Sequence, residues 1–198
     1  SSIAHAFGIE GERIYSTNPI PPESKTGIKI ISINFLLENP EVPIMWRGPL
    51  LTNALVQLYR DINWGKLDFL LLDMPPGSSD IPLTVFQFLP IDGIIMVTTP
   101  QEISAKVVSK TVNMALAMKV KIYGIIENMS YLICENCGNE IKLSSNSSTE
   151  SIAKKFKLEI LGRLPIDKKL AELFDEGKIE NYKNEEKIKI VDKILNFS

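Results

Sequence analysis

The chain is poor in the side chains that most often hold metals. Its 198 residues include one histidine, His5, and two cysteines, Cys134 and Cys137. A structural zinc site or a cubane iron–sulfur cluster normally takes four protein ligands. His5 is far from the cysteine pair in the sequence and is not a credible partner for it. Any four-thiolate site therefore needs two chains, each contributing one pair of cysteines across a two-fold axis.

Long apolar runs and an excess of basic charge are also absent. Lys, Asp or Glu interrupts each apolar run before it reaches the length of a membrane span. The net charge of −2 and the pI near 5.6 argue against bulk binding to nucleic acid or to an anionic membrane. The N-terminus lacks the basic region of a signal peptide. We therefore expect a cytoplasmic protein with neither a nucleic-acid nor a membrane partner.

Segments of strand character alternate with segments of helical spacing along the chain. The predicted strands are residues 28–35, 67–73, 93–99, 121–127 and 158–162. The predicted helices are residues 50–62, 80–89, 102–118, 150–156, 168–176 and 185–196. The inner stripe expected for the longest helix comprises Ile103, Val107, Val108, Val112 and Leu116. This alternation predicts a single α/β domain over residues 1–198, with a doubly wound, mostly parallel sheet and helices on both faces.

The stretch from Leu70 to Asp80 joins an apolar strand to a carboxylate and then to a Pro-Pro-Gly turn. Asp73 is expected at the carboxyl edge of the sheet, where α/β folds bind ligands. Gly77 allows a backbone amide to approach a ligand closely. In P-loop NTPases such an aspartate holds Mg²⁺ through water, and such a glycine amide senses the terminal phosphate. The alternative is a core strand that stops at a proline turn, with Asp73 as a turn residue.

Three further residues are expected at the same edge. Gln101 follows the strand that ends near Thr99, and it either lines a nucleotide cleft or begins the next helix. Asn128 follows another strand, and its carboxamide suits an adenine edge, although Asn is also common in turns. Pro165 follows the last strand and is placed to flank a base. We interpret these three as candidate nucleotide-binding residues.

The stretch Cys134-Glu-Asn-Cys137-Gly138 is predicted to lie on a loop after Asn128. Two thiolates at this spacing can share one metal ion or cluster. In a reducing compartment such a pair indicates metal or redox chemistry more often than a structural disulfide. Iron–sulfur binding, zinc binding, a local redox disulfide and two unligated thiols all remain open from this pattern.

Taken together, several stretches resemble the Mrp-type iron–sulfur cluster carrier ATPases, relatives of MinD and ParA among the deviant P-loop ATPases. The matching stretches are Pro43-Ile-Met-Trp-Arg-Gly-Pro-Leu50, Trp64-Gly-Lys-Leu-Asp68, Asp73-Met-Pro-Pro-Gly-Ser-Ser-Asp80, Thr98-Thr-Pro-Gln101, Glu127-Asn-Met-Ser130 and Cys134-Glu-Asn-Cys137. The resemblance implies a homodimeric ATPase that binds a 4Fe–4S cluster between its subunits and passes it to apo-proteins.

The resemblance also implies roles for individual residues. Asp73 maps to the carboxylate linked to Mg²⁺, and Gly77 maps to the switch glycine. Asn128 maps to adenine recognition of ATP. Cys134 and Cys137 map to the ligands of the cluster.

The sequence departs from this family's pattern in two places. Glu135 stands where the family usually has proline, which changes the stiffness and charge of the loop but removes no ligand. The sequence also contains no G-x-x-x-x-G-K-[ST] loop, which supplies most of the phosphate-binding energy in such enzymes. Our hypothesis is that the functional protein has an N-terminal segment that this sequence omits.

Two other functions compete with the carrier. One is a MinD/ParA-type positioning ATPase without a cluster, which would need a C-terminal membrane helix or a basic DNA patch. The other is a zinc-bridged dimer without enzymatic activity. The terminal helix carries Glu185, Glu186 and Asp192, which weakens the case for membrane binding.

Overall fold

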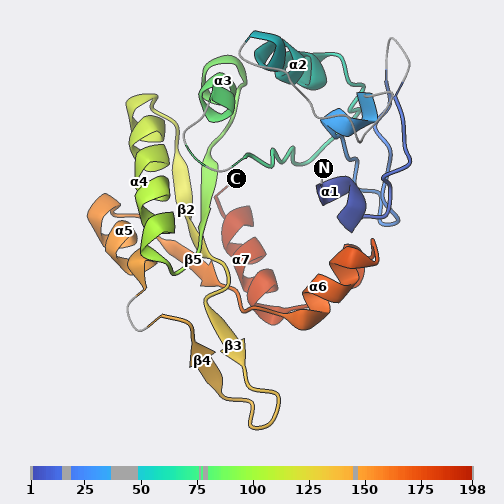
Figure 1. Cartoon of the computed structure of the whole chain (residues 1–198). Helices are drawn as coiled ribbons and strands as arrows, with labels where there is room; N and C mark the ends of the chain where they lie inside the picture. The colour runs from blue at the N-terminus through green and yellow to red at the C-terminus, as the bar shows by residue number, and fades with distance from the viewer. Residues whose placement is uncertain are drawn as a thin grey trace. The chain divides into compact units, whose positions relative to one another are not determined.

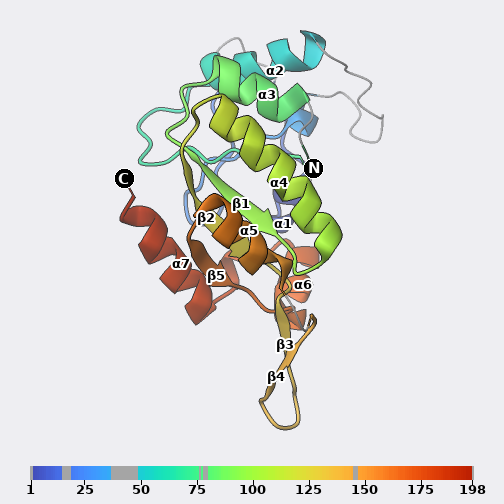
Figure 2. The same cartoon turned by 90° about the vertical axis from the view of Figure 1, so that its left-hand side faces the viewer.

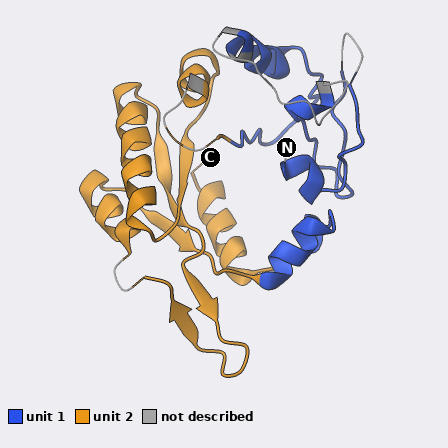
Figure 3. Cartoon of the chain, viewed as in Figure 1, with its two compact units in different colours: residues 1–73, 168–182 blue, residues 74–167, 183–198 orange. Residues whose placement is uncertain are grey.

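The computed structural model describes residues 2–14, 19–36, 49–75, 77, 80–144 and 147–197. The chain divides into two compact units, coloured separately in Figure 3. Unit 1 comprises residues 1–73 and 168–182, and unit 2 comprises residues 74–167 and 183–198. The single domain over residues 1–198 stays a prediction. Within the described residues, no helix has the length and apolar character needed to cross a membrane.

A parallel sheet organises unit 2, with strand order β1-β2-β5. The strands are β1 (Ile94–Thr98), β2 (Ile122–Glu127) and β5 (Ile160–Arg163). The helices of unit 2 are α3 (Asp80–Phe88), α4 (Glu102–Ala117), α5 (Ser148–Phe156) and α7 (Glu185–Leu195). Figures 1 and 2 show α4 and α5 on one face of the sheet and α7 on the other. The predicted α/β fold with helices on both faces is confirmed.

The core of unit 2 lies between the sheet and the α4–α5 layer. Met96 of β1 and Ile125 of β2 pack there with Val108 and Val112 of α4 and Ile152 of α5. The predicted inner stripe of α4 was wrong in part, since Ile103, Val107 and Leu116 are 69%, 38% and 53% exposed. The buried face of α4 is instead formed by Ala105, Val108, Val112 and Ala115. These positions keep helical spacing, and the small alanines let the helix approach its neighbours closely.

Unit 1 is built from short helices and irregular segments. Its elements are α1 (Ser2–Ala6), η1 (Ile33–Leu36), α2 (Pro49–Arg60), α6 (Lys168–Asp175) and η2 (Ile179–Asn181). Ala4, Ile30 and Phe35 form its buried cluster. The Glu180 carboxylate accepts a hydrogen bond from the Ser24 hydroxyl at 2.7 Å. This bond joins two segments that are 156 residues apart in the sequence.

Two predicted strands are absent from the described structure. Residues 67–73 form no strand, and Phe69 and Leu71 are 52% and 85% exposed. A buried parallel strand needs ladder partners, and the described part of the chain places no strand beside this run. In residues 28–35, Lys29 makes only an isolated bridge to Glu23, and η1 follows. The apolar composition of both segments was therefore not sufficient to form a strand.

Candidate functional site

Backbone hydrogen bonds link the chain segments at the carboxyl ends of β1, β2 and β5. The Asn128 amide donates to the Thr98 carbonyl at 2.7 Å. The Leu164 amide donates to the Glu127 carbonyl at 2.8 Å, and the Ser130 amide donates to the Leu164 carbonyl at 2.9 Å. These bonds bring Asn128 to the loop that contains the buried Pro165. Both predicted adenine-contacting residues therefore lie at one edge of the sheet, as expected.

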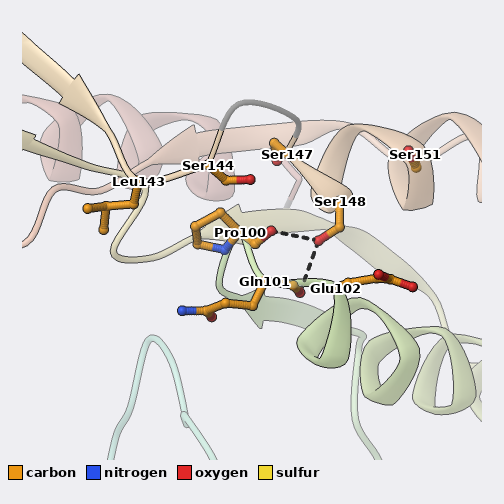
Figure 4. A pocket seen from close by; sticks show the side chains of 8 residues that line it. All are labelled: Pro100, Gln101, Glu102, Leu143, Ser144, Ser147, Ser148 and Ser151. Carbon is orange, nitrogen blue, oxygen red and sulfur yellow. Dashed lines mark hydrogen bonds between the residues drawn. The ribbon is translucent and has the colours of Figure 1, made fainter.

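Gln101 lies at the N-cap position of α4, and its side chain is exposed. Its side-chain oxygen accepts a hydrogen bond from the Thr99 hydroxyl. A pocket of about 440 Å³ lies beside it, at the first turns of α4 and α5. Figure 4 shows the side chains that line this pocket. The Ser148 hydroxyl donates to the carbonyls of Pro100 and Gln101 at 3.0 and 3.1 Å, which ties the starts of these two helices together. The structure thus places Gln101 after the carboxyl end of β1 and at the start of α4.

Asp73 and Gly77, the proposed Mg²⁺ and switch residues, are not grouped with the three candidate nucleotide-binding residues. Asp73 is exposed and belongs to unit 1, whereas Gln101, Asn128 and Pro165 belong to unit 2. Gly77 has a backbone φ of +92°, a conformation that favours glycine. Its neighbours Pro76 and Ser78 lie outside the described residues, as do residues 43–48 of the Trp-Arg-Gly-Pro stretch. The roles of Asp73 and Gly77 therefore stay predictions.

The two cysteines lie at the tip of a β-hairpin that sequence reasoning described only as a loop. Its antiparallel strands are β3 (Tyr131–Ile133) and β4 (Glu140–Lys142). Figure 1 shows the hairpin projecting beyond the sheet of unit 2. The tip is a tight turn, because the Gly138 amide donates to the Cys134 carbonyl at 2.8 Å and Gly138 has φ +70°. Both thiols are free, and Cys137 is exposed.

The turn favours the ionised form of Cys134. The backbone N–H of Cys137, followed by that of Asn136, donates to the sulfur and lowers the pKa of the Cys134 thiol. A thiolate is the form of cysteine that binds metals. Among the described residues, no group of three or more His, Cys, Asp or Glu side chains is arranged to hold a metal ion. The hairpin therefore offers two cysteine ligands, which is half of a set of four.

We expect the alkylation of Cys134 to follow this lowered pKa. In a Cys137→Ser variant, which keeps the backbone amides of the turn, the rate of iodoacetamide labelling should rise with pH around a midpoint below that of an ordinary thiol. In urea the amides no longer point at the sulfur, so the midpoint should return to the ordinary value. A folded-state midpoint equal to the urea value would contradict this interpretation of the turn.

A buried carboxylate lies at the base of the hairpin, and sequence reasoning assigned it no role. Glu127, the last residue of β2, is 1% exposed. Its carboxylate accepts hydrogen bonds from the hydroxyls of Ser130 and Ser147. The Arg163 guanidinium lies 3.5 Å away and also pairs with Glu150. The sequence held one signal for this pair, since Glu127 and Arg163 are charged residues at the ends of two apolar strands.

The environment keeps Glu127 ionised. Burial by itself raises the pKa of this carboxyl, but the hydrogen bonds from Ser130 and Ser147 and the positive charge of Arg163 outweigh burial, so the pKa is lowered overall. A buried charge with these partners is stable only while the surrounding groups hold their positions. Glu127, Ser130, Ser147 and Arg163 are together called the Glu127 cluster below.

The parallel sheet with helices on both faces, with candidate ligand residues at its carboxyl edge, is a doubly wound α/β architecture, the fold class that includes the P-loop NTPases. The chain belongs to the family described as NUBPL iron-transfer P-loop NTPases, within the ParA group, because that family's model matches residues 1–197. The resemblance stated from the sequence motifs is thereby confirmed.

Curated relatives agree with this assignment. An iron-sulfur cluster carrier protein of Clostridium perfringens is 44% identical over 163 residues, which are 82% of this chain and 57% of the relative. One from Pyrococcus horikoshii is 39% identical, over 89% of this chain and 63% of the relative. The chain thus spans about three fifths of the length of these two relatives.

A solved structure is similar over most of the chain. It is described as a nucleotide-binding protein from Archaeoglobus fulgidus in complex with ADP, with cobalt found by an X-ray emission method. It is 37% identical, with a TM-score of 0.79, and the match covers 92% of this chain and 72% of that one. The likeness confirms the α/β fold over most of the chain.

Proposed function

We propose that this chain acts in an ATP-dependent iron–sulfur cluster carrier. In this proposal two copies hold a 4Fe–4S cluster between them as cargo, and the carrier transfers the cluster to apo-proteins. The observation that carries the proposal is the hairpin tip, where a tight turn presents two free cysteines and lowers the pKa of one of them. Two relatives named as iron-sulfur cluster carrier proteins support it.

Dimerisation follows from the number of ligands. A cubane cluster takes four thiolates, and the chain contains two cysteines. The hairpin tip projects from the sheet of unit 2, and its Cys137 is exposed, so we propose that it meets the tip of a second copy. A two-fold axis through the cluster gives each subunit the same pair of ligands. We therefore propose a homodimer bridged by its cargo, and we place it in the cytoplasm as the sequence predicts.

The nucleotide is proposed to bind at the carboxyl edge of the sheet. Asn128 and Pro165 would contact the adenine of ATP, and Gln101 would line the same cleft. Asp73 would hold Mg²⁺ through a water molecule, and the metal ion would neutralise charge on the phosphates. Gly77, with its positive φ, would present its amide to the terminal phosphate. The ADP bound to the similar nucleotide-binding protein supports this part of the proposal.

We also propose that the functional protein carries a P-loop strand and helix ahead of this sequence. Within the described residues the outer edge of β1 has no partner strand, and Val97 of β1 is 60% exposed. The apolar run of residues 67–73 is also unpaired in the described structure. An inserted strand would satisfy the free backbone groups of β1. Mass spectrometry of the intact polypeptide tests this proposal, and a mass of 22.2 kDa would contradict it.

Anaerobic reconstitution with iron and sulfide tests the carrier function. The chain should give a brown product that sediments as a dimer, because a cluster shared by two chains links them. A colourless dimer that contains zinc would support the zinc-bridged alternative instead. A protein that binds ATP but takes up neither metal would favour the positioning ATPase.

The proposed role of Asp73 has its own test. In the protein that carries its P-loop, Asp73→Asn should lower ATP hydrolysis roughly tenfold or more, because a neutral carboxamide holds Mg²⁺ poorly. Asp68→Asn is the matched control, since Asp68 is an exposed carboxylate five positions earlier on the same segment. Equal turnover in the wild type and Asp73→Asn would remove Asp73 from the site.

A further inference from the structure

The Glu127 cluster ties the start of the cysteine hairpin to the start of α5. Ser130 immediately precedes β3, and Ser147 follows β4 as the N-cap residue of α5. Both hydroxyls donate to the carboxylate of Glu127, one to each of its oxygens. The Leu143 amide also donates to the Ser130 carbonyl at 3.4 Å. One carboxylate therefore holds the chain where it enters the hairpin and, beyond β4, where α5 begins.

The same carboxylate is anchored to the sheet. Glu127 is the last residue of β2, and its backbone carbonyl accepts from the Leu164 amide at 2.8 Å. The Arg163 guanidinium, 3.5 Å from the carboxylate, extends from the end of β5. The hairpin base is thus fixed to two adjacent strands rather than to a loop. Two backbone hydrogen bonds also hold the base, from the Ser130 amide to the Leu164 carbonyl at 2.9 Å and from the Ile166 amide to the Tyr131 carbonyl at 2.8 Å. The Glu127 carboxylate is the side-chain group that adds to these bonds.

A carboxylate does this better than a neutral side chain of the same shape. Both of its oxygens are acceptors, so it can take both serine hydroxyls together, and hydrogen bonds to a charged acceptor are stronger than neutral ones. A carboxamide has one acceptor oxygen, so one serine would face an N–H₂ group instead. Burying a charge is costly without such partners. Closing the turn at the hairpin tip does not require a buried charge at the hairpin base.

A cluster shared by two subunits requires precise placement of the cysteines, which gives a reason to bury a charge at the hairpin base. Cys134 is four residues beyond Ser130, so a strand rise of about 3.3 Å per residue puts it roughly 13 Å from the hairpin base. A rotation of about 10° at the base would then move the cysteine by roughly 2 Å. Metal–ligand distances tolerate deviations of only about 0.2 Å. A small rotation of the hairpin base at Glu127 would therefore displace the cysteines by more than a shared metal site tolerates.

We propose that Glu127 is a positioning residue that aims the hairpin, so that the cysteine pairs of two subunits meet at one shared cluster. The inference rests on the proposed carrier function and deepens it by naming the group that sets the geometry of the bridge. It assigns the Glu127 cluster to alignment between subunits, whereas the turn of residues 134–138 sets the local geometry of each cysteine pair. The two roles can be tested separately.

The test is an anaerobic Co²⁺ titration of Glu127→Gln, with Glu140→Gln as the matched control. Glu140 is an exposed carboxylate on β4 of the same hairpin, so the control removes the same charge without touching the Glu127 cluster. The intensity of the sulfur-to-cobalt charge-transfer band per cobalt reports the number of thiolate ligands. Sedimentation reports dimer formation, and circular dichroism with urea unfolding reports the fold.

We expect the wild type and Glu140→Gln to bind one cobalt per two chains through four thiolates. Glu127→Gln should keep its circular dichroism spectrum and the alkylation midpoint of Cys134. It should bind cobalt through two thiolates per chain, stay monomeric, and show at least a roughly tenfold loss of affinity for the bridged site, the scale found when groups that orient metal ligands are removed. A merely structural role would change the fold without this change in thiolates per cobalt.

Several results would overturn the proposal. Glu127→Gln that forms the four-thiolate dimer with wild-type affinity would do so directly. If Glu127→Gln unfolds, Ser130→Ala decides, because it keeps the charge and removes one of the two tethers. A folded Ser130→Ala with a normal bridge, or unfolding of both variants, would reject a positioning role. Failure of the wild type to form a bridged site would instead contradict the proposed function itself.

Discussion

Replacing Cys134 with serine should abolish cluster binding and dimerisation together. The chain contains two cysteines, so each variant chain would offer one thiolate and a pair would offer two of the four that a cubane cluster takes. A serine hydroxyl is not ionised near neutral pH and does not replace a thiolate at iron. Reconstitution with iron and sulfide should therefore yield a colourless monomer, read by absorbance and by sedimentation. Cys137→Ser should behave in the same way.

The control for this experiment lies between the two cysteines. Asn136→Ser changes a side chain of the same turn but keeps both thiols and the backbone N–H that points at Cys134. It should reconstitute to a brown dimer like the wild type. The fold of all three variants should be unchanged, because the turn is at the tip of the hairpin and Cys137 is exposed. A brown dimer formed by Cys134→Ser would contradict the ligand assignment.

Substituting Gly124 with alanine should strongly destabilise unit 2. A Cβ at this position would lie 2.7 Å from the Glu159 backbone oxygen and 2.7 Å from Cγ of Leu161. The first of these atoms belongs to the backbone beside β5, so it cannot rotate away. Overpacking of this kind typically costs up to about 3 kcal/mol. Urea unfolding followed by circular dichroism measures the loss.

Gly11→Ala is the matched control for Gly124→Ala. A Cβ on Gly11 would meet no atom within 4 Å, so the same added methyl group finds open space. Its free energy of unfolding should stay within about 0.5 kcal/mol of the wild type. If Gly124→Ala were as stable as this control, the close contact between β2 and the segment leading into β5 would be wrong.

The βαβ part of the fold was predictable because its signals are local. Gly93 to Thr99 and Lys121 to Glu127 are apolar runs of strand length, and the helices between and after them keep helical spacing. Three of the predicted site residues, Gln101, Asn128 and Pro165, were inferred from where such strands end. Cys134 and Cys137 were inferred from their Cys-x-x-Cys spacing. The resemblance to the iron–sulfur carrier family rested on six short stretches between residues 43 and 137 and was confirmed by the family match over residues 1–197.

The errors came from features that depend on distant parts of the chain. Residues 67–73 have the composition of a buried strand, yet they form none in the described structure, because a strand exists only where another backbone satisfies its hydrogen bonds. The buried face of α4 was set by how closely the sheet and α5 approach it, which selected Ala105 and Ala115 rather than Ile103 and Leu116. Neither feature can be predicted from the local spacing of apolar residues.

By itself, the sequence determined the α/β class, the strand ends that carry the candidate nucleotide residues, and the spacing of a cysteine pair that can share one metal ion or cluster. These follow from residue types and their spacing, which are local properties. The tertiary structure alone revealed the hairpin that carries the cysteines and the buried Glu127 at its base. Glu127, Ser147 and Arg163 come from three separate elements, so their charges and hydrogen bonds become a unit only after the sheet has formed.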